Sequence, residues 1–299
     1  MVGGSTIAEE AIARAVLLAS VFDYPLTLAQ LRRTLVASQQ TATGVLGTWA
    51  GSEWLQARIE HRDGFFYPTG RQALIAERIR REARSRVFLQ EHQRLLHLIC
   101  ALPYVDLVAL SGSVAHMNLE EGGDLDLFIV TRGRHVWSVT VAVIILARLM
   151  GRRRTLCANY VVADTALSID TAPDPFTASQ IVHLKPLVGE GTYLRFLDAN
   201  PFVRAFYPNM HGAEPSMPRI RQSVWLRGFK RCCEWMLAWP AAGAERLCRW
   251  LYRAYLKQRA DTWTSPEQVR LDDDRLKLHT HSHRQRVMQR FERARHEAM

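Results

Sequence analysis

The sequence predicts a mixed α/β domain that lies between a small N-terminal domain and a helical C-terminal region. Three observations support this fold class: helical spacing with a hairpin signal at the start, apolar runs of strand length alternating with helical stretches in the middle, and Trp- and Arg-rich helical patterns at the end. We expect residues 1–70 to form the N-terminal domain, 71–103 a connecting helix, 104–210 the α/β core and 211–299 the basic helical region.

The composition is typical of a folded protein, and we expect no secretion, because the N-terminus shows no basic region followed by an apolar stretch and a cleavage site. Of the 299 residues, 48% are apolar and 23% are charged, which excludes a wholly disordered or collagen-like chain. The longest apolar stretch, 136–150, is interrupted by Ser138, Thr140 and Arg148 and is shorter than the ~20 residues of a membrane span, so we expect a buried helix there. Five cysteines without a CxxC pair favour reduced thiols, and we expect a cytoplasmic protein.

The N-terminal domain is predicted from three helical stretches and a hairpin. Apolar residues recur at helical spacing over 7–21, Thr27 is a candidate N-cap for a second helix, and a third helical stretch covers 45–55. Asp63-Gly64 between extended residues then indicates a hairpin. This order resembles a winged helix. Winged helices often bind DNA, but the third stretch lacks the cluster of Lys and Arg that base reading would favour.

The middle of the chain reads as alternating strands and helices. A long Arg-rich helix over 71–102 ends before Pro103. Beyond it we expect strands over 105–110, 124–131 and 156–163, a buried helix over 136–150, and a helical segment over 174–207 with breaks at Pro186 and Pro201.

The basic character of the protein is concentrated at the C-terminal end. Residues 218–299 contain 18 Lys and Arg against 9 Asp and Glu, although the whole chain has a net charge of +10. We expect helices rich in Trp and Arg, a polar linker over 262–274 and a basic helix over 284–298. Such a region suits RNA or another phosphate-bearing partner, the surface of a membrane, or a solvated helical face.

Two carboxylates mark the candidate site. Asp124 and Asp126 lie two residues apart on a predicted strand, so both side chains point to the same face. Two carboxylates on one face favour a divalent cation between them, and Mg²⁺ uses such oxygens together with substrate phosphates. Upstream, Gly112 and Ser113 lie in a turn between a strand and a short helix, where backbone N–H groups suit a phosphate.

The pattern of 110–113, in which a hydrophobic residue precedes Ser-Gly-Ser, followed by Asp124-Leu125-Asp126 resembles the signature of the nucleotidyltransferase superfamily that includes DNA polymerase β. The resemblance covers about residues 104–165. It implies that Gly112 and Ser113 hold a nucleoside triphosphate and that Asp124 and Asp126 bind two Mg²⁺ or Mn²⁺ ions. The implied reaction is attack of a hydroxyl on the α-phosphate with release of pyrophosphate.

One position departs from the family pattern. The family usually has a third carboxylate on a later strand, and the matching strand here carries Asn159 in its middle and Asp164 at its end. Asp164 is five residues beyond Asn159 and of opposite parity, so we expect Asn159 at the third position unless the strand bulges or ends before Asp164. Both remain candidate catalytic residues, and an amide cannot act as a base.

The sequence therefore predicts an enzyme that transfers a nucleoside monophosphate, AMP from ATP, to a hydroxyl on a small molecule, an RNA end or a protein. The alternative is a catalytically degenerate nucleotide sensor or nucleic-acid-binding regulator that acts through its winged helix. Weaker candidates are His116, Lys185 and Arg195 as phosphate contacts and a His279, His281 and His283 cluster as a zinc site.

Overall fold

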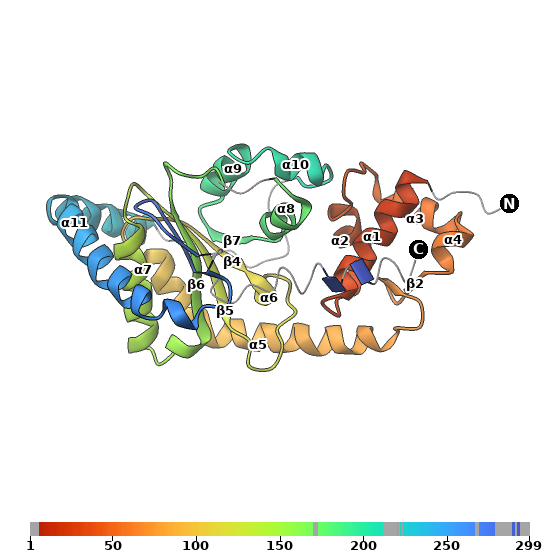
Figure 1. The fold of residues 1–299 in the computed structure, drawn as a ribbon, viewed down its shortest axis with the longest axis horizontal. Coiled ribbons are helices and arrows are strands. Elements are labelled where there is room, and N and C mark those ends of the chain that lie inside the picture. Colours follow the sequence, from red (N-terminus) through yellow and green to blue (C-terminus); the bar gives the residue numbers. More distant parts are fainter. Residues whose placement is uncertain are drawn as a thin grey trace.

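The computed structural model describes residues 6–169, 173–211, 220, 222, 224–266, 269–278, 289–290 and 292–293. Helix α5 (Ala73–Ala101) runs along the lower side of the view in Figure 1 and links the N-terminal domain to the core, with α11 at the end far from the N-terminal domain. No helix in the described ranges has both the length and the apolar character needed to cross a bilayer.

The N-terminal domain contains the predicted helices and hairpin. Its elements are α1 (Ile7–Ser20), β1 (Leu26–Thr27), α2 (Leu28–Arg33), α3 (Ala42–Ala50), α4 (Glu53–Gln56), β2 (Ile59–Arg62) and β3 (Phe65–Pro68). Thr27 caps α2 as predicted, through a hydrogen bond to the Gln30 N–H. Asp63 and Gly64 both have positive φ, which is the geometry of a two-residue hairpin turn. The third predicted helix is split, because Ser52 caps the new helix α4.

The core is a six-stranded mixed sheet in the order β7-β4-β5-β6-β9-β8. Its strands are β4 (Val105–Ser111), β5 (Leu125–Thr131), β6 (Leu156–Ala163), β7 (Lys185–Val188), β8 (Val269–Leu271) and β9 (Arg275–Leu278). Only β5 and β6 are parallel, and the other neighbours are antiparallel. The mixed α/β class is therefore confirmed.

Helices cover both faces of this sheet. Leu127 and Ile129 of β5 lie in a core with α5, α7 (Val136–Leu149) and α11 (Val224–Gln258). The alternate residues Phe128 and Val130 lie in a second core with α8 (Pro175–Val182), α9 (Glu190–Asp198) and α10 (Phe202–Phe206). This alternation follows from the two-residue period of a strand, and it assigns Asp126 to the face of Phe128. Short helices α6 (Gly112–Ala115), η1 (Arg153–Thr155) and η2 (Ala260–Thr262) join the larger elements.

Two predictions about the chain's organisation are wrong. The segment 185–188 is a strand rather than part of a helix, because it pairs with β4. The expected linker over 262–274 contains β8, and β9 after it pairs with β6, with Leu276 fully buried. The C-terminal region thus completes the core sheet, and position 211 does not separate two domains. The predicted basic helix over 284–298 lies almost entirely outside the described residues.

Candidate active site

The candidate site lies where β4 ends and where β5 and β6 begin. Asp126 is paired with Ser111 of β4 on one side and with Cys157 of β6 on the other. Asp124 directly precedes β5, so the strand begins at Leu125, one residue later than predicted. The sheet therefore brings together the turn after β4 and the two carboxylates, which are separated by about a dozen residues in the chain.

Asp124 and Asp126 form a compact acidic pair. Oxygen atoms of both carboxylates and the Cys157 sulfur lie within 4.8 Å of one another. Burial, and next the charge of Asp124, raise the pKa of Asp126 to about 7. Neither carboxylate forms an ion pair with a described residue. Two adjacent carboxylates that form no ion pair within the described part of the chain fit a divalent ion such as Mg²⁺ or Mn²⁺, which would offset their repulsion.

Asn159 lies at this site, as the parity argument predicts. Its side-chain amide donates a hydrogen bond to Asp126 Oδ1. The register shifts beside it: Asp126 faces Cys157, but Phe128 faces Tyr160, so two residues of β6 oppose Leu127. This bulge bends β6 next to the acidic pair. Asn159 is therefore a positioning residue for Asp126 and offers an amide where the resemblance calls for a carboxylate.

Asp164 is not part of the site, which corrects its inclusion among the catalytic candidates. It follows the far end of β6, where its N–H donates to the Thr131 carbonyl at 2.8 Å. Its carboxylate accepts from the Gly133 N–H at 2.8 Å. Because β5 and β6 run parallel at ~3.3 Å per residue, about five residues of strand separate Asp164 from Asp126. Its role is to close the turn after β5.

Cys157 was missed by reasoning from the sequence. It shares the strand parity of Asn159, which was the available signal, but its contact with the acidic pair depends on the register of β6. Burial, and next the negative charge of Asp124, raise the pKa of the Cys157 thiol to about 12. The thiol is therefore neutral near pH 7 and would be a poor ligand for a hard cation, so the two carboxylates are the groups here that could hold one.

Gly112 is in contact with the acidic pair. Its φ is +62°, and a Cβ added here would lie 2.1 Å from Asp126 Oδ2. Glycine is favoured at this positive φ, and the close approach to Asp126 leaves no room for a Cβ. Ser113 follows in α6, and its carbonyl accepts hydrogen bonds from the N–H groups of His116 and Asn118 at 3.2 and 2.9 Å. The Gly-Ser turn and the Asp pair therefore meet at one point.

The weaker candidates lie elsewhere. Arg195 forms an ion pair with Asp106 at 3.0 Å, and His116 and Lys185 line a separate cavity. His279, His281 and His283 lie outside the described residues. No family model matches the chain, and no curated protein or solved structure is significantly similar to it.

Proposed function

We propose that this protein is a metal-dependent nucleotidyltransferase that moves a nucleoside monophosphate, AMP from ATP, to a hydroxyl acceptor and releases pyrophosphate. One observation carries the proposal: Gly112 of the Gly-Ser turn lies directly against Asp126 of the Asp-x-Asp pair. A phosphate cradle and a pair of metal-ligating carboxylates must be adjacent for a triphosphate to contact both.

Each residue has a separate task in this proposal. Asp124 and Asp126 hold divalent ions, which when bound neutralise phosphate charge and polarise the α-phosphate. Asn159 orients Asp126 through its hydrogen bond. Gly112 leaves room beside the Asp126 carboxylate, and the backbone of Gly112 and Ser113 contacts the phosphates.

The reaction replaces one phosphorus–oxygen bond with another. The acceptor oxygen bonds to the α-phosphorus, and the bond from the α-phosphorus to the bridging oxygen breaks, so that its electron pair leaves with pyrophosphate. Because Asn159 is an amide, it does not take the acceptor proton. Solvent, or a basic group of the acceptor or substrate, removes that proton instead.

The alternative, a nucleotide sensor without catalysis, is favoured by the absence of a carboxylate at Asn159. A nucleic-acid-binding regulator acting through the N-terminal domain has less support, because α3 (Ala42–Ala50) contains no Lys or Arg. RNA is one of the acceptor classes that the proposal leaves for experiment, beside small molecules and proteins.

The deciding experiment is incubation with each labelled nucleoside triphosphate, Mg²⁺ or Mn²⁺ and a cell extract that is separated into small-molecule, RNA and protein fractions. Stable label in one fraction supports transfer and identifies the acceptor class. Saturable nucleotide binding without incorporation in any fraction supports the sensor instead.

Asn159→Asp should tighten Mn²⁺ binding by about 10-fold, because it adds an anionic ligand beside Asp126. Without metal the same change should lower the melting temperature, since a third carboxylate joins a buried acidic pair. Calorimetric titration with Mn²⁺, and melting curves with EDTA or Mn²⁺, measure both effects. Unchanged Mn²⁺ affinity would show that Asn159 does not occupy a ligand position.

A further inference from the structure

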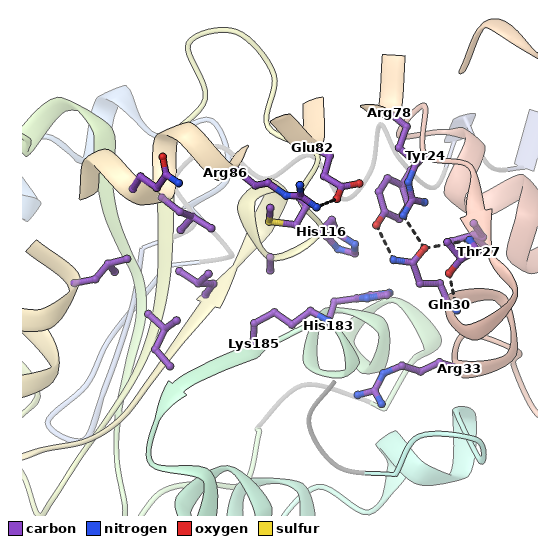
Figure 2. Close-up of a pocket in the computed structure, with 18 of the residues that line it drawn as sticks. Tyr24, Thr27, Gln30, Arg33, Arg78, Glu82, Arg86, His116, His183 and Lys185 are labelled. Atoms are coloured by element: carbon purple, nitrogen blue, oxygen red, sulfur yellow. Dashed lines mark hydrogen bonds and ion pairs between the residues drawn. The ribbon is translucent and has the colours of Figure 1, made fainter. Parts of the chain in front are cut away.

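Helix α11 (Val224–Gln258) forms the end of the molecule that is far from the N-terminal domain (Figure 1). It contributes no residue to the cluster of Asp124, Asp126 and Cys157. It also contributes none of the described residues that line the cavity between the N-terminal domain and the core, where His116 lies (Figure 2). The surface that α11 presents to solvent is therefore separate from both.

Charged residues hold the inner side of α11 against the core. Lys230 donates to the Val105 carbonyl and is only 9% exposed. Glu234 forms an ion pair with Arg132 at 2.7 Å, and its side chain is 11% exposed. Glu245, also 9% exposed, accepts hydrogen bonds from two backbone N–H groups at the start of α7, both at 2.8 Å. These contacts determine which side of α11 faces the core.

The same contacts use every acidic residue of the helix. Glu234 and Glu245 are the two carboxylates in the sequence of α11, and both lie on the inner side. The helix also carries exposed cations, namely Arg227, Arg231, Arg246, Arg253 and Lys257. The charge that α11 itself presents to solvent is therefore entirely positive.

The side of α11 opposite these contacts presents aromatic residues to solvent. Trp225, Trp239 and Trp250 are 89%, 97% and 69% exposed. They are separated by 14 and 11 residues, about four and three turns of an α-helix, so they lie along one line of the helix surface. Trp235, between the first two in the chain, is 81% exposed. The other large apolar residues exposed here include Phe229, Met236, Leu247 and Leu251.

We infer that this face of α11 lies in the interface of an anionic membrane, with the helix along the membrane surface. Trp side chains favour the headgroup region, where the ring is half-buried and its N–H is hydrated. Aliphatic side chains among the Trp residues suit contact with the upper part of the acyl chains. The flanking Arg and Lys residues match the negative charge of anionic lipids. The inner side of the helix stays packed on the core.

Two other occupants match this face less well. In a two-fold dimer the face would meet its own copy, which would bring the exposed cations of both helices together without any carboxylate of α11 to pair with them. Single-stranded RNA stacks its bases on aromatic rings, but aliphatic residues such as Met236 and Leu247 offer no ring for stacking. An anionic membrane uses the aromatic, the aliphatic and the basic residues together.

The test is co-sedimentation of the full chain with vesicles of phosphatidylcholine, with and without phosphatidylglycerol. Binding should require phosphatidylglycerol and weaken as salt is added, because salt screens the cations. Trp emission should shift to the blue, and brominated phosphatidylcholine should quench it, because the rings reach the boundary of the acyl chains. Neither nucleotide nor metal is needed, so the outcome is independent of the proposed transferase activity.

A Trp235→Ser, Trp239→Ser double variant tests the aromatic contribution. It should bind anionic vesicles at least ~10-fold more weakly, because it removes two large apolar contacts with the membrane. Both side chains are exposed, so its melting temperature should equal that of the wild type. The matched control is an Ile79→Ser, Val87→Ser double variant on α5, where the side chains are 58% and 55% exposed. It should bind as the wild type does.

A triple variant tests the basic contribution: Arg246→Gln, Arg253→Gln and Lys257→Gln. It should bind about 10- to 100-fold more weakly and with a smaller dependence on salt, because each cation near an anionic surface adds to the affinity. The control removes the same total charge from exposed positions outside α11, by Arg14→Gln, Arg62→Gln and Arg94→Gln. It should lose much less affinity, since those positions do not lie on the binding face.

Several results would overturn the inference. Binding to anionic vesicles without quenching by the brominated lipid, or equal binding by the wild type and the Trp double variant, would show that the aromatic face does not enter the membrane. Light scattering that shows a dimer disrupted by the Trp double variant would assign the face to a second copy of the chain. RNA that binds without lipid and loses affinity in that variant would assign the face to RNA.

Discussion

Asp126→Asn should reduce nucleotidyl transfer by about 1000-fold or more. The change removes one of the two carboxylates that we propose as metal ligands and keeps the shape of the side chain, so the proposed site would lose the divalent ions that neutralise the phosphates. Mn²⁺ binding, measured by calorimetry on the protein alone, should fall with the activity. This readout does not depend on knowing the acceptor.

The same variant should be more stable than the wild type when metal is absent. Burial and the neighbouring Asp124 raise the pKa of Asp126, which means that its charged form is unfavourable in the folded state. An amide removes that charge, so the melting temperature in EDTA at neutral pH should rise. Loss of activity together with a gain in stability is typical of a functional residue and not of a structural one.

Asp164→Asn is the matched control, because it makes the same chemical change at the far end of β6. The new amide oxygen can still accept the Gly133 N–H, and metal binding and transfer should stay at wild-type values. If Asp164→Asn abolishes activity while Asp126→Asn does not, the assignment of the site is wrong.

Gly112→Ala should both destabilise the protein and remove metal binding. An alanine at φ +62° costs about 1–2 kcal/mol on its own. Its Cβ would also lie 2.1 Å from Asp126 Oδ2, so the Asp126 carboxylate must move from its present position. We expect transfer to fall by about 100-fold, since displacement of a ligand by roughly an ångström is enough for such a loss.

Gly122→Ala separates these two effects. Gly122 has a similar φ of +73°, but no atom lies within 4 Å of an added Cβ. It should show the backbone cost in its melting temperature and keep Mn²⁺ affinity and transfer. If the two variants have the same Mn²⁺ affinity and the same rate of transfer, the contact between Gly112 and Asp126 has no role in either.

Elements with strong local signals were predicted correctly from the sequence. Asp63-Gly64 adopts positive φ at both residues because these types tolerate that region, and the hairpin forms around them. The apolar stretch over 136–150 forms α7 (Val136–Leu149), because it is too short for a membrane and too apolar for the surface. In both cases the residue types within the segment itself favour the observed structure.

The missed strands had no such local cause. Lys185 and Pro186 are unfavourable in strands, yet they lie in β7 because β4 provides a partner. β8 lies in the segment predicted as a linker, and no strand was predicted over β9. β9 pairs with β6, more than 100 positions earlier in the chain, and β8 pairs in turn with β9. Strand pairing over such distances leaves little trace in the local pattern.

For the candidate site too, the sequence predicted some features, and others depend on the tertiary structure. The identities and spacing of Gly112, Asp124 and Asp126 were sufficient to predict a turn and two carboxylates as the candidate site, and the structure places Gly112 against Asp126. The bulge in β6, the contact of Asn159 with Asp126 and the position of Cys157 depend on register, which a single residue of slippage would change. The cavity in Figure 2 depends on docking of α2 and α5 against β7, and the aromatic face of α11 on the buried contacts of Lys230 and Glu245. The sequence determined which residue types the protein contains, but only packing between distant segments decided which of them face a cavity, the acidic pair or the solvent.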